Sequence, residues 1–464
     1  MPRTTIIEGG TIVTPETSFR ADLIITGERI SGIVSDARGM LADERINATG
    51  HLVIPGGIDV HTHFREPEEF TKEGFTTGSH AAAAGGITTV IEMPQADPTT
   101  VNGDQFQAKR LRVAKTSIID MALWAGIIGE PRQNVVDIKE MAAMGATGFK
   151  SFMASSSPSF PAVDVEKLYW AMKIVADIGI PYALHAEDDV MLAAGLKRTQ
   201  GAGRTDALAH AESRPPIIEA VAVANVLHLA EVTGCWVHIC HCASSDALRQ
   251  IAEARAKGVR VTSETCPQYL ALNTEDLVKL GGFGRCAPAL REQSEVDQIW
   301  KYVLDETVDL ICSDHCAFTP ESKALASDDI FKAPLGLSGV QTLLPSFFDT
   351  SVNQRSLSLS QFVRQISTNP AQIFGLYPRK GTIAVGSDAD VVVLDRNKEW
   401  VAKGEDMFHK QKWTPFEGKT IKGRVLRTIR RGETIYNDAF EGQARVSGTP
   451  GSGRFLSRGY GEKD

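Results

Sequence analysis

The central part of this chain, from about residue 56 to residue 375, alternates short apolar segments with stretches of helical pattern. Helical patterns such as those of residues 215–234 and 244–258 lie between several of the apolar segments. Strands that alternate with helices form right-handed βαβ units with parallel strands. Eight segments have the length and composition of buried strands: 57–63, 87–93, 118–127, 147–153, 180–187, 235–241, 259–266 and 308–315. Eight units of this kind predict an α/β fold with a closed (β/α)8 barrel of the TIM type.

Both ends of the chain follow a different pattern. Residues 4–55 and 380–438 consist of short strand-like runs interrupted by glycine and charged turns, which is typical of β-hairpins. We therefore expect residues 1–55 and 376–440 to form one small β-sandwich domain beside a barrel of residues 56–375. Residues 441–464 are rich in glycine and serine and are expected to form an extended C-terminal tail.

The charge balance narrows the classes of partner. The 464 residues carry a formal net charge of -8 without a basic run, which argues against nucleic acid or an anionic membrane as the main partner. No uncharged apolar run reaches the ~18 residues of a membrane span, and the segment MPRTTIIEGG has no apolar signal core. The seven cysteines include no CxxC pair, which favours free thiols in a reducing compartment. These features predict a cytoplasmic protein.

Polar side chains lie at the ends of several expected strands, and one lysine lies inside a strand. They are His61, His63, Lys150, His185, His241 and Asp314. The carboxyl ends of barrel strands share one rim, where barrel enzymes have their active sites. His61 and His63 flank a single residue, so in a strand both side chains point to the same face. A buried carboxylate needs a partner, which a metal ion would supply to Asp314. Together the residues predict a metal centre, although each histidine alone also fits a hydrogen-bonded structural role and His238 competes with His241.

Lys150 and Cys316 each allow two interpretations. Lys150 lies in the apolar segment TGFKSFM, where its ammonium group could extend along the strand to the surface. A neutral buried lysine could instead react with carbon dioxide, and the resulting carbamate is an anionic ligand with two oxygens that can bridge two metal ions. Cys316 follows His315 and could be a nucleophile of a Cys–His pair. The neighbouring residues favour the metal interpretation.

Several segments occur in an order that resembles one enzyme family. They are PGGIDVHTHFREP, TGFKSFM, HAED, the strand that ends at His241, SETCPQY, SDHCAFTPESK and GLYPRKGTIAVGSDADVVVLD. From about residue 4 to residue 437 the chain resembles the cyclic amidohydrolases, which include hydantoinases (dihydropyrimidinases), allantoinases and dihydroorotases. The resemblance implies a metal-binding barrel with a side β-sandwich, usually in a homotetramer, with a dimer as the alternative. It also leads us to expect that the tail after residue 441 lies on a neighbouring subunit.

The resemblance also implies roles for the six rim residues. His61, His63 and Asp314 match the ligands of the more buried of two divalent metal ions. His185 and His241 match the ligands of the second ion, and Lys150 matches a bridging lysine carboxylated by CO2 to N6-carboxylysine. Imidazole and hard oxygen ligands suit Zn²⁺, with Mn²⁺, Co²⁺ or Fe²⁺ as alternatives.

The chemistry needs residues of these types. Two metal ions about 3.5–4 Å apart lower the pKa of a shared water and polarise the ring carbonyl. Asp314 is expected to take the proton of that water and to pass it to the leaving ring nitrogen, as a general base and then a general acid. A serine or cysteine nucleophile is not required.

The segments expected to contact the substrate point to different rings. Arg65 and residues 333–339 resemble dihydroorotases, but Ala287 and Gln95 stand where those enzymes have substrate-binding asparagines, and Phe318 stands near the place of a histidine. The segment GGITTVIEMP is similar to allantoinases and to L-type hydantoinases, and the segment TPESK is similar to allantoinases. The segment KSFMAS is closest to L-type hydantoinases, and Ser155 stands where D-type hydantoinases have a tyrosine that contacts the substrate.

We therefore expect a small cyclic amide substrate and an enzyme of the hydantoinase (dihydropyrimidinase) type, with allantoinase as the first alternative and dihydroorotase as the second. Arg65 is expected either to bind the substrate or to form a salt bridge with Glu66 or Glu69. Some relatives of the family have lost their metal ligands and act as scaffold proteins. A scaffold is disfavoured here because all six ligand positions are occupied by suitable residues.

Overall fold

The computed structural model describes residues 2–66, 73–129, 133–154 and 157–460. Its central element is a sheet of eight parallel strands in sequential order. The strands are β6 (Gly57–Thr62), β7 (Ile87–Glu92), β8 (Asp120–Gly126), β9 (Gly148–Phe152), β10 (Tyr182–His185), β11 (Val237–Ile239), β12 (Val261–Thr265) and β13 (Leu310–Ile311). The sheet closes just beyond β6 and β13, where the backbone N–H of His63 donates to the carbonyl of His315 at 2.7 Å. The (β/α)8 barrel is therefore confirmed, and each predicted strand segment contains one of its strands.

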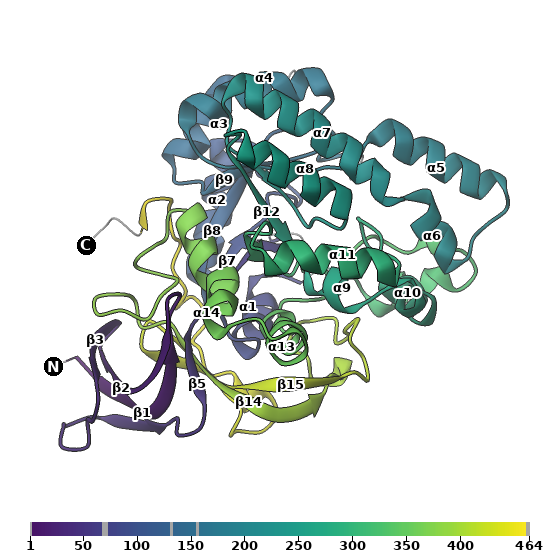
Figure 1. Ribbon diagram of the computed structural model, residues 1–464. Coiled ribbons are helices and arrows are strands. Elements are labelled where there is room, and N and C mark those ends of the chain that lie inside the picture. The colour runs from purple at the N-terminus through teal and green to yellow at the C-terminus, as the bar shows by residue number, and fades with distance from the viewer. Residues whose placement is uncertain (1, 67–72, 130–132, 155–156, 461–464) are drawn as a thin grey trace.

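Helices surround these strands (Figure 1). Those between β6 and β11 are α1 (Phe75–Ala84), α2 (Gly103–Thr116), α3 (Val135–Ala143), α4 (Val165–Ile178), α5 (Asp189–Gly201), α6 (Ala207–Ser213) and α7 (Pro216–Thr233). Those between β11 and the second sheet are α8 (Ser245–Ala256), α9 (Pro267–Ala271), α10 (Thr274–Leu280), α11 (Gln293–Leu304), α12 (Pro320–Ala324), α13 (Leu343–Phe348), α14 (Leu359–Val363) and α15 (Asn369–Ile373).

Helix α4 shows why the sequence forms these elements. The side chain of Asp164 accepts from the backbone N–H of Lys167 and so caps the first turn. Gly179 ends the helix in the left-handed conformation, with φ 79°, which glycine adopts without strain. The apolar residues between these caps recur at helical spacing and are buried: Leu168, Ala171, Met172 and Val175. This stripe packs in the main hydrophobic core.

One long apolar stretch belongs to this helical layer. Residues Ala207–Thr233 have the length and mean hydropathy, 1.4, of a segment able to cross a membrane. The stretch is divided between α6 and α7, with Pro215 and Pro216 at the start of α7. Val223 and Val226 of α7 are among the fully buried residues of the main core. The hydropathy of this stretch therefore reflects packing inside the protein.

A second sheet combines strands from both ends of the chain. Its order is β16–β15–β14–β5–β1–β2–β3, and β4 pairs with β1. The antiparallel pairing of β14 with β5, which places Val391 opposite Pro55, joins the two ends. The β-structure built from both termini is thus confirmed. The strands are β1 (Thr4–Val13), β2 (Ser18–Thr26), β3 (Arg29–Val34), β4 (Glu44–Asn47), β5 (Leu52–Pro55), β14 (Val391–Val401), β15 (Thr420–Arg430) and β16 (Glu433–Asn437).

The tail differs from the expectation that it lies on a neighbouring subunit. Its described part, residues 441–460, runs along the barrel of its own chain. The backbone N–H of Leu456 donates to the carbonyl of Met121 at 2.8 Å, and the N–H of Met121 donates to the carbonyl of Arg454, also at 2.8 Å. Leu456 is fully buried. The tail therefore pairs with the backbone at the amino end of β8 and covers apolar surface of the barrel, which the composition of the tail does not reveal.

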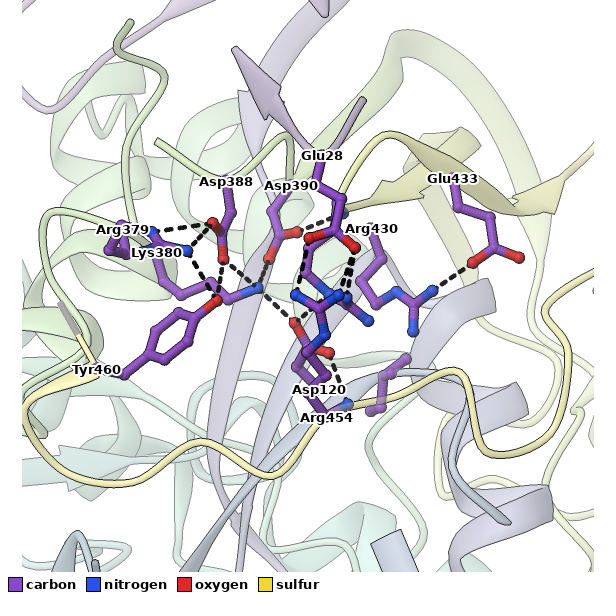
Figure 2. A network of polar contacts seen from close by, with 12 residues as sticks. Glu28, Asp120, Arg379, Lys380, Asp388, Asp390, Arg430, Glu433, Arg454 and Tyr460 are labelled. Atoms are coloured by element: carbon purple, nitrogen blue, oxygen red, sulfur yellow. Dashed lines mark hydrogen bonds and ion pairs between the residues drawn. The ribbon is translucent and has the colours of Figure 1, made fainter. Parts of the chain in front are cut away.

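A buried charge network joins the barrel, the second sheet and the tail (Figure 2). Lys380 Nζ lies 2.6 Å from a carboxylate oxygen of Asp120, at the start of β8, and 2.8 Å from one of Asp390. Arg431 adds a contact of 3.0 Å to Asp120. From the tail, the hydroxyl of Tyr460 donates to Asp388 at 2.9 Å. The network lies at the amino end of β8, and it holds these three parts of the chain together at the end opposite the rim.

Candidate active site

Three of the predicted metal ligands converge at the carboxyl end of the barrel. His61 lies in β6, His63 directly follows it, and Asp314 follows β13. The Nε2 atoms of His61 and His63 lie 3.3 and 3.4 Å from the same oxygen of Asp314. One donor atom from each of the three residues lies within 4.8 Å of the others. Two imidazole nitrogens and a carboxylate oxygen at these distances suit a divalent metal ion.

The other two histidines form an adjacent pair. His185 ends β10, and His241 follows β11. His185 Nδ1 lies 2.9 Å from His241 Nε2, and the ring of His241 is 5.3 Å from that of His61 between centroids. Both nitrogens point at the space between the rings. This pair therefore suits a second metal ion beside the first.

Lys150 lies in β9 and is fully buried. Its Nζ lies 2.9 Å from the sulfur of Cys240 and 4.9 Å from the centre of the Phe152 ring. Within the described ranges, no carboxylate forms an ion pair with it. An unmodified ammonium group offers only donors, whereas the carboxylated form that the family resemblance implies would offer two oxygen ligands.

Burial and neighbouring carboxylates act in opposite directions on the histidines. Burial lowers the pKa of His63 to about 3 and the pKa of His241 well below its usual value. Burial alone would also lower the pKa of His61, but the carboxylates of Glu264 and Asp314 outweigh it and raise that pKa to about 10. Neutral imidazole is the form that binds metal. Burial alone would raise the pKa of Asp314, but the neighbouring imidazoles of His61 and His63 outweigh it and lower that pKa. Asp314 is thus a carboxylate.

The backbone is strained at several rim residues. Arg65, His241 and Asp314 have φ values of 59°, 35° and 48°. Residues other than glycine rarely adopt this left-handed region, and each instance costs about 1–3 kcal/mol. Strain of this kind persists where the surrounding structure holds a side chain in a required direction. It is therefore a further sign that the rim is a functional site.

Residues 52–435 match the model of the amidohydrolase family. The chain belongs to this family. An allantoinase of Rubrobacter xylanophilus is 39% identical over 453 residues, which are 97% of this chain and 97% of the relative. An allantoinase of Escherichia coli is 34% identical over 438 residues, which are 93% of this chain and 95% of the relative.

Solved structures of hydantoinases are also similar to this amidohydrolase. The L-hydantoinase (dihydropyrimidinase) of Arthrobacter aurescens has a TM-score of 0.93 and 31% identity, and the match covers 99% of this chain and 100% of the other. The dihydropyrimidinase of Brevibacillus agri has a TM-score of 0.89 and 31% identity, with 98% of each chain covered. These matches confirm the cyclic amidohydrolase family. The protein is a hydrolase that acts on cyclic amides.

Two buried carboxylates that the sequence analysis did not assign hold the histidines of the amidohydrolase in place. Glu264 contacts His61 Nδ1, lies 3.1 Å from His238 Nε2 and accepts from the backbone N–H of His241. Its contact with Nδ1 leaves His61 Nε2 facing Asp314. The second carboxylate is Glu187, which lies 2.7 Å from His185 Nε2. The only sign of the two carboxylates in the sequence is that they lie in the segments SETCPQY and HAED, because each meets its partners only in the folded chain.

Glu92 fixes the turn that carries Arg65. It ends β7 and is fully buried. Its carboxylate accepts from the hydroxyl of Thr62 at 2.7 Å and from the backbone N–H groups of Phe64 and Arg65 at 3.1 and 2.8 Å. The Arg65 side chain is thereby directed into the space above the metal ligands.

A cavity of about 380 Å³ opens above the histidines. The predicted substrate residues Arg65, Gln95 and Ala287 all line it, together with Phe318. Ser155 lies outside the described residues. The predicted metal ligands on the cavity surface are His61, His63, His185, His241 and Asp314, and the remaining wall comes from Phe152, Ala154, Ser157, Arg214, Arg285, Cys316, Pro334, Leu335 and Gly336.

Arg65 extends across one side of this cavity. Its Nη2 lies 3.2 Å from the sulfur of Cys316 and 3.4 Å from the amide oxygen of Gln95, and its guanidinium carbon is 5.3 Å from the centre of the Phe318 ring. Glu66 caps the backbone N–H of Phe75 instead, and Glu69 lies outside the described residues. Arg65 thus forms no ion pair with a carboxylate in the described part of the chain.

The Cys–His alternative finds no support in the position of His315. Its Nδ1 accepts from the backbone N–H of Gly339 at 3.0 Å, and its Nε2 lies 3.9 Å from Glu73. Cys316 lines the cavity beside Arg65. The histidine therefore faces a different set of groups from the thiol.

Proposed function

We propose that this amidohydrolase opens a five-membered cyclic ureide with a polar substituent on ring carbon 5, and that allantoin is its preferred substrate. The observation that carries the proposal is the pair of Arg65 and Gln95 on the cavity wall, 3.4 Å apart. The substituent of allantoin is a ureido group, which has a carbonyl acceptor and N–H donors. A guanidinium can donate to that carbonyl while the amide oxygen of Gln95 accepts from an N–H. The similarity to allantoinases supports this choice.

In this proposal, His61, His63 and Asp314 hold one divalent metal ion, His185 and His241 hold another, and carboxylated Lys150 connects the two. When bound, the ions supply a water of lowered pKa and a polarised ring carbonyl. Zn²⁺ suits the donor set, and Mn²⁺, Co²⁺ and Fe²⁺ share its preference for imidazole and oxygen. The support is the convergence of these donor atoms in the barrel rim.

Asp314 moves the proton in this proposal. As a carboxylate it can accept a proton from the attacking water, because its oxygen already points into the space between His61 and His63. It can then donate that proton to the ring nitrogen when the amide bond breaks. Arg65 and Gln95 hold the substituent, and the apolar wall excludes further water.

The second candidate function is that of a hydantoinase, which would open a ring with an apolar substituent on carbon 5. The side chains of Phe152, Phe318 and Leu335 give part of the cavity an apolar wall, and the similarity to L-hydantoinase supports this reading. Dihydroorotase stands third, because Ala287 and Phe318 offer no polar group to a ring carboxylate.

A panel of rings tests the proposal directly. The purified enzyme, loaded with zinc or manganese, is assayed with allantoin, hydantoin, 5-benzylhydantoin, dihydrouracil and dihydroorotate. We expect the highest kcat/KM for allantoin, and at least about a 10-fold lower value for dihydroorotate, or about 1.4 kcal/mol of discrimination. A higher kcat/KM for the benzyl compound would favour the hydantoinase instead, and dihydroorotate as the best substrate would overturn the proposal.

Arg65→Gln tests the residue that carries the proposal. It should lower kcat/KM for allantoin about 10-fold more than for unsubstituted hydantoin. Arg396→Gln, at an exposed position of β14, is the matched control.

We also propose that the protein assembles as a homotetramer and is located in the cytoplasm. Light scattering of the purified protein tests the assembly.

A further inference from the structure

A buried ammonium group lies behind the cavity wall, apart from the metal ligands. It belongs to Lys323 of α12, whose side chain is fully buried. Each of its three N–H donors has an acceptor. The acceptors are the carbonyl oxygens of Arg285, Pro334 and Gly336, at 3.0, 3.0 and 2.8 Å.

The surroundings of Lys323 compensate its charge without a carboxylate. Its Nζ lies 5.6 Å from the centre of the Trp413 ring, and the titratable groups that act on its charge are the thiols of Cys286 and Cys316 and the guanidinium of Arg285. Within the described residues no acidic side chain forms an ion pair with it. Burying such a group is costly unless hydrogen bonds satisfy it. Methionine, which is of similar length, would fill the same space, so packing alone does not require an ammonium group here.

The three carbonyls belong to two segments that both line the cavity. Arg285 and Ala287 come from the segment after α10, and residues 334–336 come from the segment after α12. The two segments also touch directly, because the backbone N–H of Gly336 donates to the carbonyl of Arg285 at 3.1 Å. Arg285 Nη1 adds a bond of 2.9 Å to the carbonyl of Phe331. Lys323 therefore fastens together the wall that faces the ring substituent.

We propose that Lys323 is a positioning residue that fixes this wall and thereby determines how tightly the enzyme binds a ring with a substituent on carbon 5. The inference rests on the proposed function, because the wall lies beside the place that Arg65 gives to the substituent: the backbone N–H of Cys316, whose sulfur Arg65 contacts, donates to the carbonyl of Leu337 at 2.7 Å. Without the ammonium group the three carbonyls lose their shared donor and the two segments separate. Binding of a substituted ring weakens, while the proposed metal centre keeps its ligands, because Lys323 contacts none of them.

The burial of Lys323 supports this view, because it lowers the pKa of the ammonium group to about 7. A neutral amine has only two N–H donors for three carbonyls. The hydrogen bonding by which Lys323 joins the two segments is therefore sensitive to pH near neutrality.

The test compares Lys323→Met with Lys332→Met, which changes an exposed lysine of the nearby turn Ile330–Lys332. For Lys323→Met, KM for allantoin should rise at least about 10-fold while kcat and the metal content stay close to those of the wild type, since the lost interaction acts on binding. KM for unsubstituted hydantoin should change much less. Lys332→Met should leave every parameter unchanged. Lys323→Gln, which keeps two donors, should give an intermediate KM and serves if Lys323→Met does not fold.

Hydrogen exchange of the backbone amides separates this inference from the proposed function, because it needs no substrate. We expect faster exchange in residues 285–289 and 333–339 of Lys323→Met or Lys323→Gln. Unchanged exchange there overturns the inference, whichever ring the enzyme prefers. A lowered melting temperature with an unchanged KM also overturns it, because that result describes a purely structural residue. A wild type that opens no substituted ring overturns the proposed function, and the exchange data then still decide whether Lys323 positions the wall.

Discussion

The imidazole of His185 donates through Nε2–H to a carboxylate oxygen of Glu187 only two residues away, at 2.7 Å. Arg214 holds the same carboxylate with two contacts of 2.8 and 3.1 Å. Glu187 is therefore hydrogen-bonded to Nε2 of His185, which leaves Nδ1 facing His241. A carboxylate in this place fixes the tautomer and direction of a metal ligand.

Glu187→Gln should weaken metal binding. Because the neutral amide orients His185 less firmly, we expect metal affinity to fall by about 10–100-fold. Metal analysis after titration with a chelator measures this loss. Glu212→Gln, which changes an exposed carboxylate paired with Arg204, is the control. Equal chelator resistance in both variants would show that Glu187 has no such role.

Asp314→Asn should abolish most of the turnover. The amide cannot accept the proton of the attacking water, so kcat should fall by about 10²-fold or more. Since Asp314 is also a proposed metal ligand, metal content is measured on the same sample. A variant with full metal and the kcat of the wild type rules out Asp314 as the proton carrier.

Leu456→Ala should destabilise the chain itself. The side chain belongs to the tail and is fully buried in the hydrophobic core, so its truncation should cost about 2–5 kcal/mol. Phe440→Ala, at a side chain that is 52% exposed, should have little effect on the melting temperature. If Leu456→Ala instead changes the mass in light scattering and leaves the melting temperature unaltered, the tail acts between subunits, as the sequence led us to expect.

The pKa of Lys323 gives a prediction for stability. Its folded value of about 7 lies below the usual 10.5, so between these pH values the unfolded chain binds more protons at this residue. The free energy of unfolding contributed by this group therefore rises with pH in that window. The melting temperature of the wild type relative to Lys323→Met should increase from pH 7 towards about pH 10. A constant difference shows that the pKa is not lowered.

The barrel and its rim could be predicted from the sequence because both follow from the local pattern of apolar and polar residues. An apolar run followed by a histidine or an aspartate marks the end of a barrel strand, and barrel topology then brings His61, His185 and Asp314 together. Contacts between segments that are far apart in the chain leave no such pattern in the sequence. In the sequence, Leu456 is one of few apolar residues in a polar tail, and only the fold brings it to Met121. Lys323 in TPESK has the sequence of an exposed helical turn, and only the fold places the segments near residues 285 and 335 around it.

The carboxylates around the rim were missed for the same reason. Glu264 follows the pattern of a strand residue, and nothing near it in the sequence indicates that it meets His61 and His238. The choice of ring also depends on such contacts. Arg65 was expected either to pair with a glutamate or to face the substrate, and only its position beside Gln95 and Cys316 favours the second interpretation.

The metal content of the wild type and of Lys150→Ala, measured together with ring opening, tests the central claim most directly. We predict about two divalent ions per chain in the wild type, and the loss of metal and of activity in Lys150→Ala, partly restored by short carboxylic acids or bicarbonate that replace the carbamate. A Lys150→Ala variant that keeps two ions and turns over cyclic amides at the rate of the wild type would contradict the account.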